Sequence, residues 1–185
     1  MKISRLISIL LALTFFGCSD DIQILEERIK TQAELNNTEI SSAEIKRTAL
    51  YLNAWSKKDF YKDAINEFLE EDKLDFPKEI EVLFTGSSSI RFWNSLEDDM
   101  HPLKVLNRGF GGAHIAHVNH HFEDVIQRYS PKAIVFFCGT NDLTALKTPQ
   151  ETIQDFEILK DKVHQALPGV HLFVIGIKPS PARVY

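Results

Sequence analysis

The sequence predicts an α/β fold in which helices cover a parallel sheet, as a three-layer sandwich. Short apolar runs alternate with longer segments whose apolar residues recur every three or four positions. One run, residues 133–137, is apolar throughout, as is typical of strands that are buried on both faces of a parallel sheet. Alternation of this kind indicates strands that are joined by crossover helices.

The elements can be placed in order along the chain. A helical pattern over 43–69 comes first, with apolar residues at three- and four-residue steps: Ile45, Ala49, Leu52, Trp55, Phe60, Ala64, Ile65 and Phe68. A charged connector then leads to a strand, a helix that begins at Ser89, and a second strand; the two strands are 80–84 and 103–106. The next helix, 113–129, has one apolar face: Ile115, Val118, Phe122, Val125 and Ile126. After the strand 133–137, we expect a helix over 149–167, a break at Gly169 and a strand over 170–175.

Composition indicates one globular domain with an N-terminal appendage. The 185 residues are 44% hydrophobic and 25% charged, which is enough apolar material for a core. The formal net charge is −5, and no cluster of Lys or Arg interrupts the acidic balance. We expect no nucleic-acid partner, because binding to nucleic acid needs a basic patch.

The N-terminal residues have the features of an export signal. Two basic residues precede an apolar stretch, 6–16, which is too short for a membrane-spanning helix. The stretch ends in Gly17-Cys18, which resembles a bacterial lipoprotein signal. The resemblance implies that 1–17 is removed, that Cys18 carries lipid, and that Ser19 directs the protein to the outer membrane of the cell envelope. A conventional signal with a free cysteine and a single membrane anchor are the alternatives.

The predicted organisation has three parts: a signal peptide over 1–17, a polar tether over 18–42 and a domain over 43–185. The tether holds the domain away from the membrane, and three of its apolar residues follow helical spacing: Ile22, Leu25 and Ile29. No disulfide is expected, because Cys138, the second of two cysteines, ends a strand that we expect to be buried.

Polar turns follow three of the strands. The carboxyl ends of parallel strands meet at one edge of a sheet, where ligands bind. Ser88, Gly112 and Asn141 each lie just past a strand end, so we expect all three at this edge. Ser88 also opens a helix, where developing negative charge is favoured and a serine can act as a nucleophile. Serines at this position are equally typical of simple helix N-caps.

The other two turns carry hydrogen-bond donors. Gly109, Gly111 and Gly112 allow backbone N–H groups to approach a ligand, and one N–H aimed at an oxyanion contributes about 3 kcal/mol. Asn141 offers a neutral amide that suits a carbonyl oxygen as it becomes charged. A plain glycine turn, a phosphate cradle and a polar turn are the alternatives for these two segments.

Taken together, these segments resemble the SGNH (GDSL-type) hydrolase family, in the branch close to platelet-activating-factor acetylhydrolase-like proteins. Residues 83–93 are similar to the first block of the family, 107–112 to the second, 139–142 to the third and 177–183 to a later stretch. The resemblance covers roughly residues 50–185. It implies the flavodoxin-like sheet of that family.

The resemblance also implies an activity and roles. Ser88 would be the nucleophile, and its backbone N–H, the Gly112 N–H and the Asn141 amide would form an oxyanion hole. Ser87 stands where the family usually has an aspartate. The implied enzyme is a serine ester hydrolase that removes a short acyl group, often acetyl, from a carbohydrate or lipid ester. The reaction passes through an acyl-enzyme and needs no cofactor.

One part of the family pattern is missing from its usual place. The family takes its general base from a late Asp-x-x-His segment, and we expect no such pair in this sequence. The last strand and the final helix of the fold are also missing. We expect either a fragment of a longer enzyme or a frameshift that replaced the tail after Arg183. The alternative function is therefore a catalytically inactive lipoprotein of this fold that acts as a binding module.

Four histidines cluster at the start of one expected helix: His114, His117, His120 and His121. His117 and His121 are four residues apart and can share a metal, but no glutamate stands between them in the order of a zinc motif. We expect a solvated helix face near the pocket, with His114 lining the pocket, and no metal site. A nucleotide- or phosphate-binding protein is disfavoured, because no phosphate motif with a partnered lysine is present.

Overall fold

The computed structural model describes residues 17–178, which form two compact units. The first ends at Trp55 and the second begins at Ser56. Residues 43–55, which the sequence pattern groups with the sheet domain, therefore belong to the first unit. Within residues 17–178, no helix combines the length and the apolar character that a membrane crossing needs.

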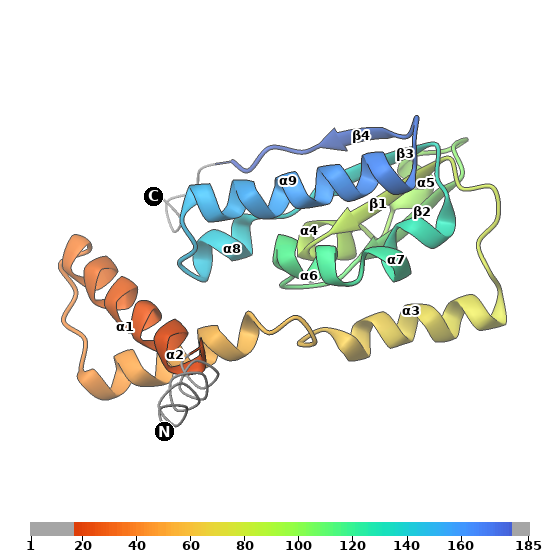
Figure 1. Ribbon diagram of the computed structural model, residues 1–185. Helices are drawn as coiled ribbons and strands as arrows, with labels where there is room; N and C mark the ends of the chain where they lie inside the picture. Colours follow the sequence, from red (N-terminus) through yellow and green to blue (C-terminus); the bar gives the residue numbers. More distant parts are fainter. Residues whose placement is uncertain (1–16, 179–185) are drawn as a thin grey trace, which may run out of the picture. The chain divides into compact units, whose positions relative to one another are not determined.

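The first unit is a helical hairpin of α1 (Gly17–Leu35) and α2 (Ser42–Trp55), which pack against each other (Figure 1). A capping box begins α2: the Ser41 backbone N–H donates to Glu44 Oε2 at 3.0 Å, and the Glu44 N–H donates to Ser41 Oγ at 3.3 Å. The predicted tether thus contains a full helix. Of the predicted signal peptide, residues 1–16 lie outside the described residues, and the lipidation of Cys18 stays a prediction.

The helical pattern over 43–69 is two helices instead of one. The first is α2, and the second, α3 (Lys62–Leu74), starts after a polar turn and runs into the predicted connector. The Lys57 carbonyl in that turn accepts a hydrogen bond from His117 Nε2 at 3.1 Å, so the backbone there is held by a distant side chain. Periodicity alone does not reveal such a contact.

A four-stranded parallel sheet forms the centre of the second unit, as predicted. Its strands are β1 (Val82–Gly86), β2 (Val105–Gly109), β3 (Ala133–Phe137) and β4 (His171–Val174), in the order β2-β1-β3-β4. The register pairs Gly86 with Gly109 on one side and with Phe137 on the other. The carboxyl ends of the three strands that precede the candidate turns therefore lie level with one another.

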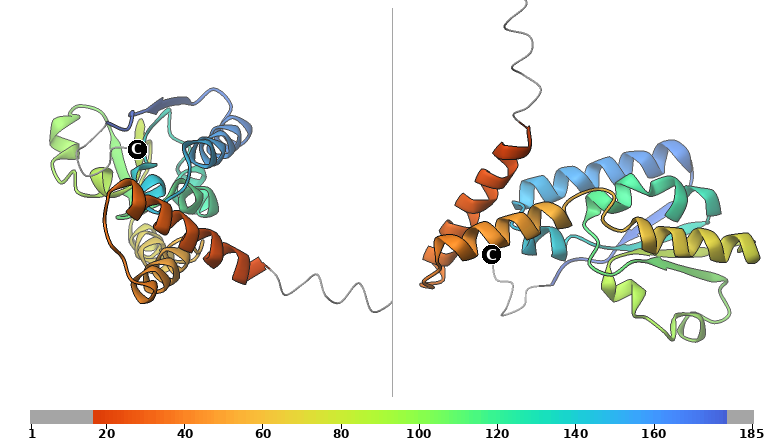
Figure 2. Two further views of the ribbon diagram at one scale, coloured as in Figure 1. Left: turned by 90° about the vertical axis from the view of Figure 1, so that its left-hand side faces the viewer. Right: turned by 90° about the horizontal axis from the view of Figure 1, so that it is seen from below.

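Helices cover both faces of the sheet, which confirms the three layers. One face packs on α3, α6 (Ile115–His120), α7 (Phe122–Val125) and α9 (Pro149–Ala166), through a core that includes Leu83 and Ile134. The other face packs on the short helices α4 (Ser88–Arg91) and α5 (Leu96–Asp99), through Phe84 and neighbouring apolar residues. The left view of Figure 2 shows α4 and α9 on opposite sides of the sheet. Successive strand residues point to opposite faces, so Leu83 and Phe84 enter different cores.

Two predicted helices are interrupted. The helix expected from Ser89 is split into α4 and α5, and the helix expected over 113–129 is split into α6, α7 and a 3₁₀ turn, η1 (Gln127–Tyr129). A short helix, α8 (Thr140–Thr144), also follows β3. In contrast, α9 is continuous and starts at a capping box in which Thr148 Oγ1 accepts from the Glu151 N–H at 3.1 Å.

Candidate active site

The turn after β1 presents Ser88 at the start of α4. Gly86 has φ of +124°, and a Cβ there would lie 2.1 Å from the Phe137 carbonyl oxygen, so only glycine fits. The same oxygen accepts a hydrogen bond from the Ser87 N–H at 2.9 Å. Ser87 is buried, Ser88 is half-buried and Ser89 is exposed. The chain therefore turns sharply after β1, and Ser88 lies at the carboxyl edge of the sheet with its side chain partly accessible.

The segment after β2 is tied to this turn by Asn107. Its Nδ2 donates to the Ile90 carbonyl at 2.7 Å, and its Oδ1 accepts from the Gly109 N–H at 2.9 Å. Gly109 is required here, because a Cβ would lie 2.7 Å from the Arg91 backbone nitrogen. Asn107 thus links the end of α4 to the glycine-rich segment that contains Gly112, whose φ is +79°.

The segment after β3 reaches the same place. Asn141 lies in the first turn of α8, and its Nδ2 donates to the Ala113 carbonyl at 2.9 Å. Cys138 is buried, as predicted, and its Sγ lies 3.1 Å from the same oxygen. A primary amide carries two N–H groups, so the second N–H of Asn141 can serve a ligand. The side chain of Asn141 is therefore held one residue away from Gly112.

The structure thus brings the three predicted site residues to one edge, each on a turn that other residues hold in place. The strand register aligns the ends of β1, β2 and β3, and the bonds of Asn107 and Asn141 join the turns. The bond of Asn107 to Ile90 joins residues that are 17 positions apart, so no local sequence pattern reveals it.

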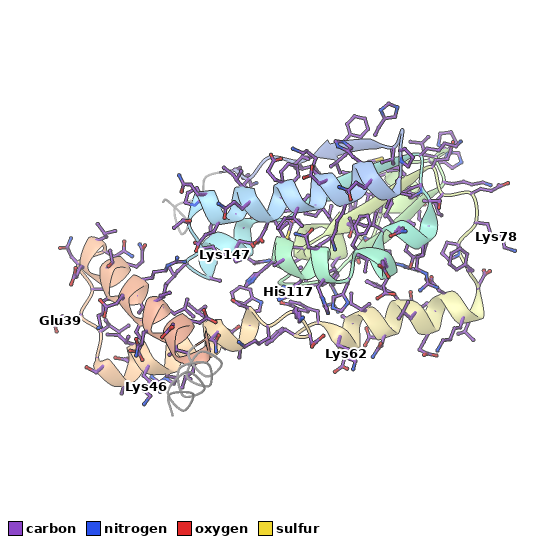
Figure 3. The ribbon with its side chains drawn as sticks, viewed as in Figure 1. Glu39, Lys46, Lys62, Lys78, His117 and Lys147 are labelled. Atoms are coloured by element: carbon purple, nitrogen blue, oxygen red, sulfur yellow. The ribbon has the colours of Figure 1, made fainter. Side chains whose placement is uncertain are left out.

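The histidine cluster is a structural element and not the solvated face that the sequence predicts. His114, His117 and His121 are buried, and only His120 is exposed. His117 Nδ1 accepts from the His114 N–H at 2.9 Å, which places the proton on Nε2, and Nε2 donates to Lys57 (Figure 3). His120 Nε2 lies 3.2 Å from Asp59 Oδ1, so these rings bind the segment before α3.

Burial also sets the charge state of His114 beside the candidate site. Burial, followed by the neighbouring His117 and Lys147, lowers the pKa of His114 to about 3, so its ring is neutral at pH 7. Among residues 17–178, no group of three or more His, Cys, Asp or Glu side chains is placed to hold a metal ion.

The expectation that the chain has no Asp-x-x-His pair is wrong, because two pairs have this spacing. They are Asp98 with His101 and Asp161 with His164. Both histidines are exposed, the first just before β2 and the second near the end of α9. Each lies toward the amino ends of the strands, away from Ser88. The Ser88 hydroxyl makes no hydrogen bond to a histidine within residues 17–178.

A buried charge network supports the end of β2. Arg108 Nη2 lies 2.6 Å from Asp72 Oδ1, and Arg108 Nε donates to the Tyr129 hydroxyl at 2.8 Å. The Tyr129 hydroxyl donates to Asp72 Oδ2 at 2.6 Å. Burial and the bond to Asp72 raise the pKa of Tyr129 to about 12. Asp72 lies in the charged connector that the sequence places before the strand 80–84, but its side chain is buried in this network.

A polar hollow of about 400 Å³ lies beside the glycine-rich segment, between α3 and the α4–α5 region. Its lining includes Gly109 together with charged, amide and aromatic side chains: Glu67, Glu71, Arg91, Asn94, Trp93 and Glu97. Carboxylates and amides bind hydroxyl groups, and an aromatic ring offers an apolar face. Ser88, Gly112 and Asn141 are not among the residues that line this hollow.

Comparison with known proteins agrees with the predicted family. A model of the GDSL-like lipase/acylhydrolase family matches residues 84–185. A Streptococcus pneumoniae structure named as a platelet activating factor is 19% identical with a TM-score of 0.60, and the match covers 75% of this chain and 63% of that one. This likeness shows the fold.

Two further solved structures are similar to this chain. A Parabacteroides merdae structure named as a GDSL-like lipase is 18% identical with a TM-score of 0.44, and covers 58% of this chain and 67% of its own. The TesA structure is also 18% identical, with a TM-score of 0.45, and covers 55% of this chain and 63% of its own. No curated protein matches the chain.

Proposed function

Because the chain belongs to the GDSL-like lipase/acylhydrolase family, we propose that it is a serine ester hydrolase with Ser88 as its nucleophile. The observation that carries the proposal is the turn at Gly86, which leaves Ser88 half-buried at the edge where the Gly112 segment and Asn141 meet.

In the proposed reaction, Ser88 Oγ attacks the carbonyl carbon of the ester. The new Oγ–acyl bond forms as the bond to the alcohol oxygen breaks, and the hydroxyl proton passes through a general base to the leaving alcohol. Water then releases the acyl group by the reverse route. The Ser88 N–H, the Gly112 N–H and the Asn141 amide stabilise the oxyanion, and each donor contributes about 3 kcal/mol.

The proposed substrate is a short acyl ester, most simply an acetyl ester, of a carbohydrate or a lipid. The polar hollow lies beside Gly109 and Arg91 and is not lined by Ser88, so it supports a carbohydrate only as a place where carboxylates and an amide could bind hydroxyl groups of a larger alcohol portion. The chain spans 63% of the length of the pneumococcal structure, so substrate choice is a proposal about the whole enzyme.

A second candidate function is a catalytically inactive binding module of the same fold. It is favoured by one observation: within residues 17–178, no histidine bonds to the Ser88 hydroxyl in the way that a general base does. In either case we propose attachment to the cell envelope through lipid on Cys18, on the resemblance of residues 1–18 to a lipoprotein signal. Incorporation of a fatty-acid analogue that is lost in Cys18→Ser would support this attachment.

The test uses p-nitrophenyl acetate, butyrate and octanoate with the full chain. Hydrolysis should be fastest for acetate and should vanish in Ser88→Ala. The matched control is Ser89→Ala, because Ser89 is the exposed neighbour in the same turn. If Ser88→Ala retains the full rate, Ser88 has no part in the reaction.

Added imidazole separates the two candidate functions. A site that lacks only its base should gain activity as imidazole supplies one, and the gain should be absent from Ser88→Ala under the same conditions. An imidazole-dependent rate that requires Ser88 supports the hydrolase with a preformed oxyanion hole. Equal rates in both proteins favour the binding module.

A further inference from the structure

Side chains from the β3–α8 turn clamp the segment that follows Gly112. The Asn141 amide donates to the Ala113 carbonyl, and both oxygens of Asp142 accept from the Ile115 N–H, at 3.1 and 3.3 Å. The Asp142 side chain is fully buried. Two neighbouring residues of α8 therefore hold both ends of the segment 113–115.

Lys147 completes this arrangement from the link between α8 and α9 (Figure 3). Its Nζ lies 3.0 Å from Asp142 Oδ1 and 2.5 Å from Asp155 Oδ2, and its backbone N–H donates to the Asp142 carbonyl at 3.0 Å. The ammonium group thus bridges the buried carboxylate to the first half of the long helix α9. Asp155 in turn lies on a helix whose capped start and packed face keep it in place.

Electrostatics explains why Asp142 needs this lysine. Burial raises the pKa of Asp142, so the environment favours the neutral acid, and Lys147 opposes that effect. Although burial lowers the pKa of Lys147, the two carboxylates raise it overall. Removal of the ammonium would leave a buried carboxylate that must either take a proton or turn away from Ile115.

We propose that Lys147 and Asp155 are positioning residues of the oxyanion hole. Their ion pairs keep Asp142 aimed at the Ile115 N–H, and Asp142 thereby sets the distance between the Gly112 N–H and the Asn141 amide. The inference rests on the proposed function and deepens it. Because the negative charge develops on the carbonyl oxygen only as the reaction proceeds and is absent from the bound ester, loss of this alignment lowers kcat and leaves KM nearly unchanged.

The test combines kinetics with amide hydrogen exchange of the full chain. Lys147→Met should lower kcat roughly 10- to 100-fold, and exchange of the Ile115 amide should become at least about tenfold faster, because its acceptor is weakened when Asp142 takes a proton and is lost when the side chain turns away. Asp155→Asn, a milder change, should also lower kcat and speed exchange of the Ile115 amide. Lys147→Arg keeps the positive charge, so both its kcat and its Ile115 exchange should stay close to those of the wild type. The control is Lys132→Met, which removes an exposed ion pair with Glu81 elsewhere.

The outcomes separate this inference from the proposed function. Unchanged Ile115 exchange in both Lys147→Met and Asp155→Asn overturns the inference, whether or not the wild type cleaves esters. Faster exchange with unaltered kcat in an active enzyme also overturns it. Faster Ile115 exchange in the two variants, together with a wild type that cleaves no ester with or without imidazole, removes the proposed function but supports the role of Lys147 and Asp155 in holding Asp142 on the Ile115 N–H. If Lys132→Met altered kcat and Ile115 exchange as much as Lys147→Met does, the effects would reflect a general loss of stability, and the inference would be overturned.

Discussion

Acid should weaken the second unit through His114, the buried ring beside the glycine-rich segment. Its pKa in the folded protein is lowered to about 3, mainly by burial, whereas an unfolded chain binds the proton near pH 6.5. Between these values the unfolded chain holds one more proton than the folded protein does. The stability that is present above pH 6.5 is therefore lost as the pH falls.

The size of the effect follows from this difference. Each pH unit below 6.5 removes close to 1.36 kcal/mol, so acidification from pH 7 to pH 5 should lower the free energy of unfolding by about 2 kcal/mol through His114 alone. Burial also lowers the pKa of His121, which adds in the same direction. The raised pKa of Asp142 acts in the opposite sense, since its contribution is lost as the pH rises.

Urea unfolding at pH 7, 6 and 5 measures this effect in the wild type and in His114→Gln. The variant should be less dependent on pH by about 2 kcal/mol over this range, and contributions of other groups cancel in the difference. His171→Gln is the control, because His171 is exposed at the start of β4. Parallel pH curves for the wild type and His114→Gln would refute the argument.

Three further changes test the fold by urea unfolding and the site by hydrolysis of p-nitrophenyl acetate. Gly86→Ala should lower the free energy of unfolding by at least about 1–3 kcal/mol through its backbone conformation alone. It should also abolish hydrolysis, because a Cβ would lie 2.1 Å from a β3 carbonyl oxygen. A variant as stable as the wild type would contradict this turn geometry. Arg108→Met should lower the free energy of unfolding by up to about 3–5 kcal/mol, since the buried Asp72 loses its nearest cation and keeps only the Tyr129 hydroxyl and the more distant Arg128, and adding Asp72→Leu should recover part of the loss. Thr148→Ala should cost about 1 kcal/mol through loss of the cap of α9, without changing kcat; a change in kcat would tie the cap to the site.

Regular elements were predictable where the pattern is local and complete. The predicted strand 133–137 matches β3 at both ends, and α9 ends within one residue of the predicted 149–167. The capping residues and the apolar face of α9 lie within the helix segment itself, so a local pattern is enough to predict it. The splitting of the helix over 113–129 was not predictable. Its apolar spacing continues through His121, but the buried His117 and the exposed His120 bond to the segment 57–59, about 60 positions earlier.

The candidate site divides in the same way. Ser88, Gly112 and Asn141 were predictable, because each follows a strand and parallel strands bring their carboxyl ends together. Most of the residues that hold these turns in place were not predictable. Asp142, for example, accepts a hydrogen bond from the Ile115 N–H, 27 positions earlier in the chain.

The sequence by itself determined the family, the parallel sheet and the three turns of the candidate site, because strand and turn signals depend on neighbouring residues. Only the tertiary structure decided that Asp72 is buried against Arg108, that the histidines bind a backbone segment, and that Lys147 bridges Asp142 to α9. Each of these contacts joins separate elements through polar groups. Which polar groups meet depends on how the helices pack on the sheet, and the periodicity of the sequence does not predict that packing.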